Sequence, residues 1–380
     1  MVYLDWNATT PQHPDVLAAQ EAARPLAWAN PASVHKAGRA ARRIQEDTRE
    51  QLARALSVHP RDVLFTSGGT EANHLALSGA TSLITSRLEH PSVAATADEL
   101  ARRGVPVEWL AVPSQGRLEP ASIGEALARL TSSGRLGTRA IVAVQAANHE
   151  TGVLQPLAEI AELVHTAGAR LHVDAVQLLG RGDHPVLEVA DSIAVASHKI
   201  RGPKGVGALA FRCDFQPIPL GRGGAQERGL RPGTQDAVAL AGFGAALARL
   251  DDSRQAYRRA SGLCRAMEEW LLARFGGTVA GQGAPRLGHI SNWIASGGGP
   301  SMTGDELVAA LDLEGICISS GSACSAGTAE PSPVIEAMLG REPARRAVRI
   351  SLGESTDESD VAEFRAALER VLGQPAPNAS

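Results

Sequence analysis

The chain has 380 residues, more than one ordinary compact domain, so two domains are expected before any motif is considered. Apolar residues make up 44% of the sequence and aromatic residues 3%, which is typical of a globular core built from aliphatic side chains. The formal net charge is only -4 and basic residues are interspersed with acidic ones, which argues against a nucleic-acid partner. No apolar run approaches the roughly 20 residues that span a bilayer, and the first residues lack the pattern of a secretion signal, so we expect a cytoplasmic protein without a membrane partner.

Short apolar runs alternate with amphipathic stretches over the first 250 residues, which is the pattern of strands and crossover helices in an α/β fold. Ser33 is the expected N-cap of a helix whose apolar positions keep a spacing of three and four residues up to position 55. A second helix is predicted over residues 156–167, ending at Gly168. The strand candidates are residues 63–66, 82–85, 107–112, 140–144, 171–173, 192–196 and 208–211. Together they predict one large sheet.

After residue 221 the sequence changes to a Gly- and Arg-rich loop. Helical patterns follow at about 235–250 and 254–275, and a second short α/β region ends near residue 372. We expect a large domain over residues 15–250 and a small domain made of residues 1–14 and 251–380.

Lysine occurs only at positions 36, 199 and 204, and Lys199 has the most informative place. It follows the strand candidate 192–196 directly, and α/β proteins form ligand sites at the carboxyl ends of their strands. A lysine that forms an imine needs such a partly desolvated place, where its neutral amine is accessible. A solvated loop lysine is equally compatible with this position taken alone.

Asp174 ends the apolar run 171–173, where a carboxylate is costly unless it meets a cation or hydrogen-bond donors. A pyridinium nitrogen is one such partner, because a carboxylate beside it keeps the ring protonated and preserves it as an electron sink. The alternative is a helix N-cap. The presence of Lys199 at another strand end favours the first interpretation.

Residues 67–71, with the sequence Ser-Gly-Gly-Thr-Glu, connect the strand candidate 63–66 to a helical stretch. At such a turn the backbone around Gly69 can approach an anion at the positive end of the helix, and Thr70 adds a hydroxyl donor. The Walker lysine is missing, so a small phosphate group fits better than a nucleoside triphosphate. Residues 205–210 match a dinucleotide-binding pattern by letter, but they lead into a strand instead of a helix, so we reject that interpretation.

The motifs together resemble the class V aminotransferase family of pyridoxal-phosphate enzymes, and within it the cysteine desulfurases that supply sulfur for iron–sulfur clusters. The resemblance is carried in chain order by residues 3–11, 30–35, 65–73, 89–90, 148–152, 172–177, 197–205, 231–234, 320–324 and 349–353. It implies a fold type I transferase of the α/β class. The large domain would hold a mostly parallel seven-stranded sheet, and a smaller α/β domain would carry Arg349 and the loop of Cys324.

On the cofactor side, the resemblance implies that Lys199 binds pyridoxal 5'-phosphate as an imine. Asp174 would contact the pyridine nitrogen and Gln177 the phenolic oxygen, while His90 would stack on the ring and move protons. The residues implied to hold the phosphate are Gly69, Thr70, Ser197, His198 and, from the neighbouring subunit of a homodimer, Thr234.

On the substrate side, the resemblance implies that Arg349 binds the substrate carboxylate, which suits its planar fork of donors. Asn148 would lie beside the ring, and Asn30 would also line the site. Two departures stand out. The family usually has its serine one residue before Ser197, and a second Asn is common where this chain has His149.

Cysteine occurs at positions 213, 264, 317 and 324, too few and too far apart for a disulfide framework or a short metal-type pair. Cys324 lies in residues 319–328, which consist otherwise of Ser, Gly, Ala and Thr. Such a segment packs poorly and forms rigid helix with difficulty, so we expect it to move, as a nucleophile that delivers sulfur must. Cys264 and Cys317 suit the usual alternative of a small buried residue.

The resemblance implies an enzyme that converts L-cysteine to L-alanine and leaves a persulfide on Cys324, for transfer to a sulfur acceptor such as an iron–sulfur scaffold. It also implies a homodimer with shared active sites, and no metal is expected. A selenocysteine lyase and a class V transaminase are the alternatives; the Cys324 loop argues against the second and does not exclude the first. An inactive docking partner is disfavoured, because the residues of every predicted role, from Lys199 to Arg349, are present.

Overall fold

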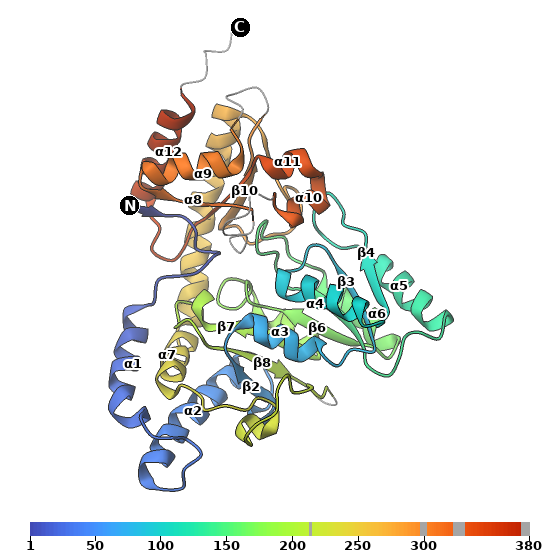
Figure 1. Cartoon of the computed structure of the whole chain (residues 1–380). Coiled ribbons are helices and arrows are strands. Elements are labelled where there is room, and N and C mark those ends of the chain that lie inside the picture. Colours follow the sequence, from blue (N-terminus) through green and yellow to red (C-terminus); the bar gives the residue numbers. More distant parts are fainter. Residues whose placement is uncertain (213–214, 297–301, 322–330, 374–380) are drawn as a thin grey trace.

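The computed structural model describes residues 1–212, 215–296, 302–321 and 331–373 (Figure 1). Cys324 and most of its loop lie outside these residues. A broad sheet flanked by helices fills one half of the molecule, and a smaller unit that contains the N-terminal strand and the C-terminal helix lies beside it (Figure 1).

The large sheet has seven strands within the described residues, in the order β2-β8-β7-β6-β5-β3-β4. Their bounds are β2 Val63–Thr66, β3 Ser82–Ser86, β4 Val107–Leu110, β5 Ala140–Gln145, β6 Arg170–Asp174, β7 Ser192–Ala196 and β8 Gly207–Phe211. Only the pairings of β8 with β2 and β7 are antiparallel in this sheet of the described chain. The predicted α/β class and mostly parallel seven-stranded sheet are therefore confirmed.

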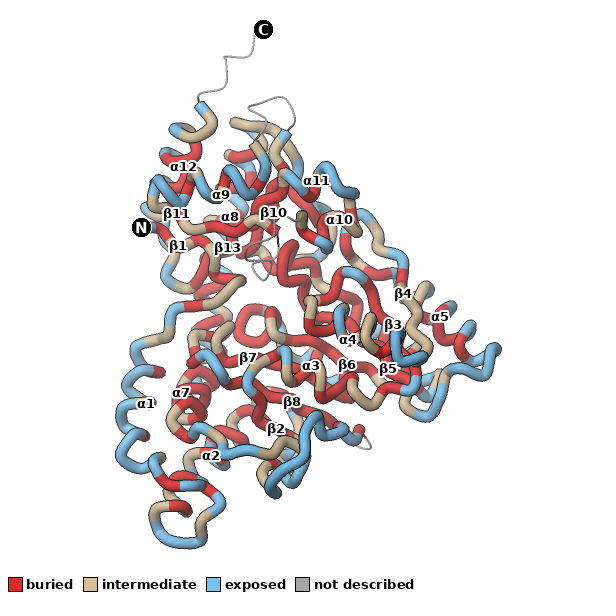
Figure 2. The backbone as a smooth tube through the Cα atoms, in the orientation of Figure 1, coloured by how far each residue is buried: buried red, intermediate tan, exposed pale blue. Residues whose placement is uncertain are grey.

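Helices cover both faces of this sheet, because alternate residues of its strands point to opposite sides. In β5, Ile141 and Ala143 pack in one core cluster, whereas Val142 and Val144 pack in another. The first cluster includes residues of α3 Gly69–Leu77 and α4 Pro91–Arg102. The second includes residues of α2 Lys36–Ala55, α5 Pro120–Ser132, α6 Leu157–Thr166 and α7 Ala237–Leu247. Apart from the first three residues of β4 and the first residue of β6, these strands are buried, and the outer faces of the helices are exposed (Figure 2).

Helix ends agree less well with the sequence patterns than strands do. α6 ends before Gly168, whose φ of 73° is the left-handed conformation expected of a C-terminal glycine. The prediction of Ser33 as the N-cap of α2 is wrong. The helix begins at Lys36, and the side chain of His35 caps it by accepting a hydrogen bond from the backbone N–H of Gly38 at 3.2 Å. The backbone N–H of Ser33 instead closes a turn on the carbonyl of Asn30.

The smaller unit is built around a four-stranded antiparallel sheet of the described residues, in the order β12-β13-β10-β9. Its strands are β9 Thr278–Val279, β10 Ile290–Ile294, β12 Ser319–Ser320 and β13 Ala347–Ser351. A separate parallel pair joins β1 Val2–Tyr3 to β11 Ile316–Cys317. The remaining helices are α1 Pro14–Ala27, α8 Leu250–Phe275, α9 Gly304–Leu313, α10 Pro333–Leu339, α11 Arg341–Arg345 and α12 Glu358–Leu372.

One core cluster joins the chain's two ends, with Val2 and Leu4 packed together with α8, α9 and α12. Residues from near both termini therefore share this core. Ile290 and Val334, however, belong to the core cluster of the large sheet, so the two units share packing and the predicted division near residue 250 stays a prediction.

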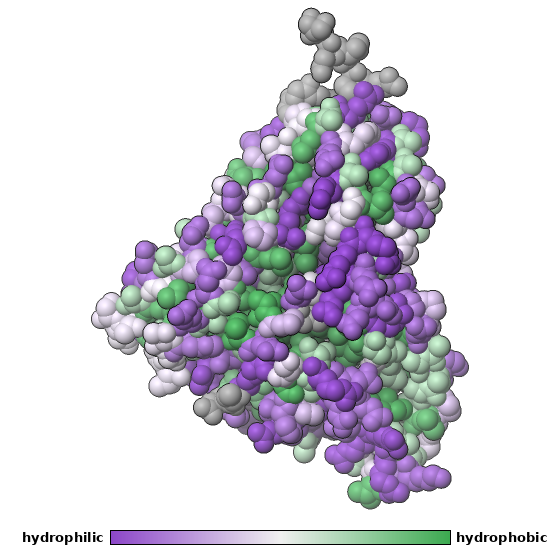
Figure 3. All heavy atoms as spheres, turned by 180° about the vertical axis from the view of Figure 1, so that it is seen from behind, coloured by the Kyte–Doolittle hydropathy of each residue, from purple (hydrophilic) through white to green (hydrophobic). Residues whose placement is uncertain are grey.

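No helix within the described residues is long and apolar enough to cross a membrane. Seen from behind, the surface mixes polar and apolar residues over both units (Figure 3).

Candidate active site

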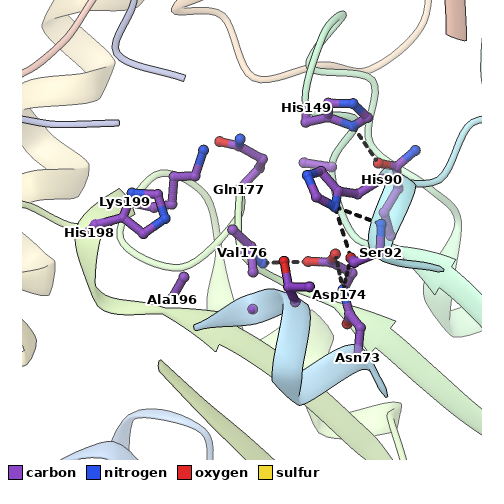
Figure 4. A pocket seen from close by; sticks show the side chains of 14 residues that line it. Asn73, His90, Ser92, His149, Asp174, Val176, Gln177, Ala196, His198 and Lys199 are labelled. Carbon is purple, nitrogen blue, oxygen red and sulfur yellow. Dashed lines mark hydrogen bonds between the residues drawn. The ribbon is translucent and has the colours of Figure 1, made fainter. Parts of the chain in front are cut away.

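A cavity of about 130 Å³ lies at the carboxyl ends of β5, β6 and β7, beside the first turns of α3 and α4 (Figure 4). Ligand sites form at this edge of an open α/β sheet, because strand ends and helix N-termini converge there. The lining residues are Gly69, Thr70, Asn73, His90, Ser92, Gln145, Ala147, His149, Asp174, Val176, Gln177, Ala196, His198 and Lys199.

Lys199 ends the short 3-10 helix Ser197–Lys199 that follows β7 directly. Its Nζ donates hydrogen bonds to the backbone carbonyls of Asn7 and, at 2.8 Å, Ala8. Residues near the start of the chain therefore hold this amine at the cavity wall. A partly buried amine held by neutral carbonyl groups suits a lysine that forms an imine.

Asp174 is the last residue of β6 and is only 7% exposed. Its Oδ1 accepts a hydrogen bond from the backbone N–H of Val176 at 3.0 Å, and its Oδ2 accepts one from Nδ2 of Asn73 at 2.8 Å. Donors stabilise a buried carboxylate. A carboxylate that accepts these two bonds keeps lone pairs that can take a further donor from the cavity.

Helix α3 begins at Gly69, and Gly68 at its N-cap supplies no side-chain acceptor for the first turn. The first backbone N–H groups of a helix have no partner within it, so a small anion can bind there. A Cβ on Gly69 would lie 2.6 Å from Cγ2 of Val176, so only glycine lets the backbone lie this close to the cavity wall. Thr70, the next residue, also lines the cavity.

His198 lines the same part of the cavity. Burial lowers its pKa to about 3, and nearby positive charges, Lys199 first among them, add to the shift. The ring is therefore neutral at physiological pH, with Nδ1 3.0 Å from the hydroxyl of Thr9. A neutral imidazole retains one N–H donor, which suits contact with a phosphate oxygen.

Two further imidazole rings, His90 and His149, meet edge to face at a centroid distance of 5.3 Å, across the cavity from Lys199 (Figure 4). Burial lowers the pKa of both rings, and that of His149 falls well below its usual range. Nearby charges act on His90 in opposite directions, since Asp174 raises its pKa and Lys199 lowers it. Both rings are consequently neutral near pH 7.

The whole chain has relatives of known family. It matches the family model for aminotransferase class-V over residues 2–364. It is 35% identical to the IscS-like cysteine desulfurase of Mycobacterium tuberculosis, with 98% of this chain and 96% of that protein covered. The chain belongs to the class V aminotransferase family.

Solved structures support the same assignment. A NifS-like protein from Rickettsia africae superposes with a TM-score of 0.87 at 30% identity, over 98% of this chain and 99% of that one. SspA, solved in complex with cysteine, superposes with a TM-score of 0.79 at 28% identity, over 94% of this chain and 100% of that one. As a class V aminotransferase, the chain is a pyridoxal-phosphate-dependent enzyme of the predicted fold type.

The cavity of this class V chain has the groups that pyridoxal phosphate requires. Asp174 offers a carboxylate for a protonated ring nitrogen, and the first turn of α3 offers N–H groups for a phosphate. A side chain at Gly69 would collide with Val176, so glycine keeps the backbone of that turn close to the cavity wall. Lys199 supplies an amine for the aldehyde. The donor and acceptor set therefore fits the cofactor.

Seven residues of the predicted site line this one cavity: Lys199, Asp174, Gln177, His90, Gly69, Thr70 and His198. The structure brings them together from the ends of β6 and β7 and from the start of α3 and α4. Their individual roles toward cofactor and substrate stay predictions.

Asn148 is fully buried, and among the described residues it lies behind the cavity lining instead of in it. Its Oδ1 accepts hydrogen bonds from the backbone N–H groups of Glu150 and Thr151 at 2.9 and 2.8 Å. Its Nδ2 donates to the carbonyl of Leu88 at 3.0 Å. The side chain thus stabilises the turn that carries His149.

Three other predicted residues also lie away from the cavity in this subunit. Ser197 is fully buried, and a Cβ on Gly202 would lie 2.0 Å from its Oγ, so its hydroxyl packs against that loop. Asn30 and Thr234 are exposed. Asn30 accepts a hydrogen bond from the backbone N–H of Ala32 at 2.9 Å. Exposure at Thr234 is what a contribution to a neighbouring subunit requires.

Arg349 lies in β13 next to the cavity wall and is 2% exposed. One Nη donates to the backbone carbonyl of His149 at 3.3 Å, and the other is 2.8 Å from Oδ1 of Asp5. Its Nε has no hydrogen-bond partner within the described part of the chain. The adjacent strand β12 pairs Ser319 with Arg349, so the segment that leads to Cys324 starts beside this guanidinium.

Asn73 and Ser92 both line the cavity, although no role was predicted for either residue from the sequence. A signal for Asn73 was available, because it follows Thr70 by three residues and so shares a face of α3 with it. No sequence pattern pointed to Ser92, since its role depends on a contact with the side chain of His90 at the start of α4.

Proposed function

We propose that this chain is a cysteine desulfurase, which takes sulfur from L-cysteine, releases L-alanine and stores the sulfur as a persulfide on Cys324. The observation that carries the proposal is the convergence of Lys199 and Asp174 on one cavity from the ends of neighbouring strands. The whole-chain similarity to an IscS-like cysteine desulfurase supports the choice of substrate. So does the similarity to SspA, which was solved with cysteine.

The chemistry divides between the cofactor and the protein. Pyridoxal phosphate, when bound, supplies the electron sink. The amine of Lys199 would hold the cofactor through its aldehyde and, as a free amine, would take the Cα proton of the substrate. Asp174 would accept a hydrogen bond from the ring nitrogen and keep that nitrogen protonated. His90 lies on the opposite side of the cavity, where it can donate a proton or a hydrogen bond (Figure 4).

The thiolate of Cys324 attacks the sulfur of the bound cysteine, because the thiolate is the nucleophilic form. A sulfur–sulfur bond forms as the carbon–sulfur bond breaks. The electron pair of the broken bond stays on the carbon, which is protonated to the methyl group of alanine. L-cysteine and the Cys324 thiol thus become L-alanine and a Cys324 persulfide without an outside oxidant or reductant.

Arg349 is proposed to bind the substrate carboxylate. It is a fully buried cation with only one carboxylate partner, Asp5, and with an unused Nε donor among the described residues. A guanidinium has five donors, so it can bind a second carboxylate without releasing the first.

A homodimer is proposed to complete each site, with Thr234 of one subunit reaching the phosphate of the other. The persulfide would pass to a sulfur-acceptor protein such as an iron–sulfur scaffold. The few cysteines and the proposed thiol chemistry suit a reducing compartment, so we place the reaction in the cytoplasm.

The purified protein should be incubated with L-cysteine in the absence of reductant, and alanine and the Cys324 persulfide should be measured in the same sample. Stoichiometric formation of the two products is expected. Cys324→Ser should abolish both sulfur transfer and sulfide release, while Cys317→Ser should keep them. Turnover by Cys324→Ser with a keto acid would favour a transaminase, and a strong preference for L-selenocysteine would favour the lyase.

A further inference from the structure

Asn73 contacts Asp174 of the proposed site directly and is linked to His90 through Ser92 (Figure 4). It is 1% exposed and projects from the second turn of α3. Its Nδ2 donates to Oδ2 of Asp174 at 2.8 Å and to Oγ of Ser92 at 2.8 Å. Ser92 in turn contacts His90, so an unbroken path of hydrogen bonds joins the carboxylate to the imidazole.

The direction of this path follows from the chemistry of its ends. A carboxylate only accepts hydrogen bonds, so the amide of Asn73 must turn its NH2 group toward Asp174. Oδ1 of Asn73 then lies 2.9 Å from Nε2 of His172, so this nitrogen must donate the hydrogen bond. Burial lowers the pKa of His172 to about 4, so this ring is neutral and can hold its single proton on Nε2.

At the other end, Nδ1 of His90 accepts a hydrogen bond from the backbone N–H of Ser92 at 3.1 Å. A backbone N–H can only donate, so Nδ1 must carry a lone pair. The hydroxyl of Ser92, 2.8 Å from the same nitrogen, must then donate as well. The donors therefore run outward from Asn73, whose Nδ2 donates to Asp174 on one side and to Ser92 on the other, and Ser92 donates in turn to His90.

We propose that Ser92 and Asn73 are positioning residues that hold His90 in the neutral form protonated on Nε2 and tie its ring to Asp174. In this form His90 acts in the cavity as a donor through Nε2–H. It becomes an acid–base group only when Nδ1 takes a proton and loses both donors. The consequence for catalysis rests on the proposed function, whereas the position of the ring proton does not.

Other groups also face His90 and affect its pKa. Asp174 raises the pKa of His90 and Lys199 lowers it, and burial has the largest effect. The edge of His149 lies against the ring, and burial raises the pKa of the preceding residue, Glu89. Removal of a donor to Nδ1 makes protonation of that nitrogen easier, so the pKa of His90 should rise toward its ordinary value.

The ring proton can be located by nuclear magnetic resonance on the cofactor-bound protein labelled with 15N in histidine, with His90→Gln identifying the signals. In the unsubstituted protein, one His90 nitrogen should behave as protonated and the other as a hydrogen-bonded acceptor. In Ser92→Ala and Asn73→Ala the two signals should move toward averaged positions, and the pKa of His90 should rise. A proton on Nδ1, or variants that leave both signals and the pKa unchanged, would overturn the proposal.

A kinetic arm tests whether the path matters for turnover. Loss of one neutral hydrogen bond should lower kcat by roughly two- to tenfold in Ser92→Ala, with little change in KM and with the acid side of the pH profile moved upward. Ser92→Thr keeps the hydroxyl and should restore the profile. Ser122→Ala is the matched control, because Ser122 also lies in the first turn of a helix that starts with proline, far from the cavity.

Two failures remain distinguishable. If the unsubstituted protein forms no alanine from cysteine, the proposed function fails, and the spectra still decide the position of the ring proton. If Asn73→Ala does not fold, Ser92→Ala alone decides, since its backbone N–H and the helix start remain. Equal pH profiles for Ser92→Ala, Ser92→Thr and Ser122→Ala would count against any role of the path in catalysis.

Discussion

Asp5, two residues after β1, and Arg349 in β13 form an ion pair of 2.8 Å. Arg349 is 2% exposed, so Asp5 is the carboxylate that compensates a buried positive charge. The other oxygen of Asp5 accepts a hydrogen bond from Ser319 at 3.0 Å, on the strand that leads to the Cys324 segment. This one carboxylate therefore joins the proposed substrate-binding cation to the start of the proposed nucleophile's segment.

Asp5→Asn should lower the free energy of unfolding by about 3 kcal/mol, because removing one partner of a buried ion pair leaves the other charge uncompensated. Replacing Arg349 as well, in Asp5→Asn with Arg349→Met, should recover part of this loss, since no buried charge then remains. Denaturant unfolding of the two single variants and the double variant measures the coupling. If the losses of unfolding free energy in the two single variants simply add up in the double variant, the ion pair contributes nothing to stability.

Arg349→Ala should lower kcat/KM for cysteine by about 10- to 150-fold, the effect of losing one charge-assisted hydrogen bond, while cofactor content stays intact. Arg349→Lys keeps the charge but loses the planar fork, so an intermediate loss is expected. Steady-state kinetics and cofactor absorbance give both readouts. A variant that loses its cofactor would instead assign Arg349 a structural role.

Most strands of the large sheet were predictable because they are short, buried and mainly apolar runs, and β2 and β7 have the predicted bounds. The N-cap of α2 could not be predicted, because N-cap preferences favour Ser over His. In this protein three helices are capped by histidine side chains that accept a hydrogen bond from a backbone N–H group. These are His13 at α1, His35 at α2 and His90 at α4. A histidine can cap only where the chain presents its Nδ1 to the next turn, which the sequence does not encode locally.

The site shows the same division. Lys199 and Asp174 could be placed because the ends of parallel strands meet at one edge of a sheet. The side-chain orientations of Asn148 and Ser197 could not be predicted. The amide of Asn148 bonds to a distant backbone carbonyl, and the hydroxyl of Ser197 packs against the loop at Gly202. The contacts of Asn73 could not be predicted for the same reason, since its partners come from two other elements, Ser92 from α4 and Asp174 and His172 from β6.

Lys199→Ala should lose the adduct that borohydride traps between protein and cofactor, because the imine nitrogen is gone. Lys204→Ala, five residues along the same loop region, is the matched control and should keep the adduct. Peptide mapping by mass spectrometry locates the modified residue. An adduct on Lys36 or Lys204 in the unsubstituted protein would contradict the assignment.

The buried ring of His172 should make the fold sensitive to acid. Its pKa is lowered by burial from 6.5 to about 4, so the unfolded chain binds more protons between these values and stability falls as pH falls. The difference corresponds to about 3 kcal/mol, present above pH 6.5 and lost by pH 4.

His172→Gln replaces the imidazole by an amide, which can still form hydrogen bonds but does not titrate. Its unfolding free energy should therefore fall less steeply between pH 6.5 and 4 than that of the unsubstituted protein. His74→Gln, a partly exposed residue on α3, is the control and should keep the original slope. Parallel slopes for all three proteins, measured by urea unfolding, would show that His172 does not titrate on unfolding.

The proposed sharing of active sites predicts complementation between two defective subunits. Thr234→Ala should weaken cofactor binding by about 10- to 150-fold through loss of a hydrogen bond to a charged phosphate, and Lys199→Ala should be inactive. If Thr234 serves the neighbouring subunit, a heterodimer of the two has one site with both lesions and one with neither. The intact site should show half the activity of the unsubstituted dimer and its full cofactor affinity. If Thr234 served its own subunit, each site would carry one lesion, and purified heterodimers with two different affinity tags would show only half the activity of the Thr234→Ala parent.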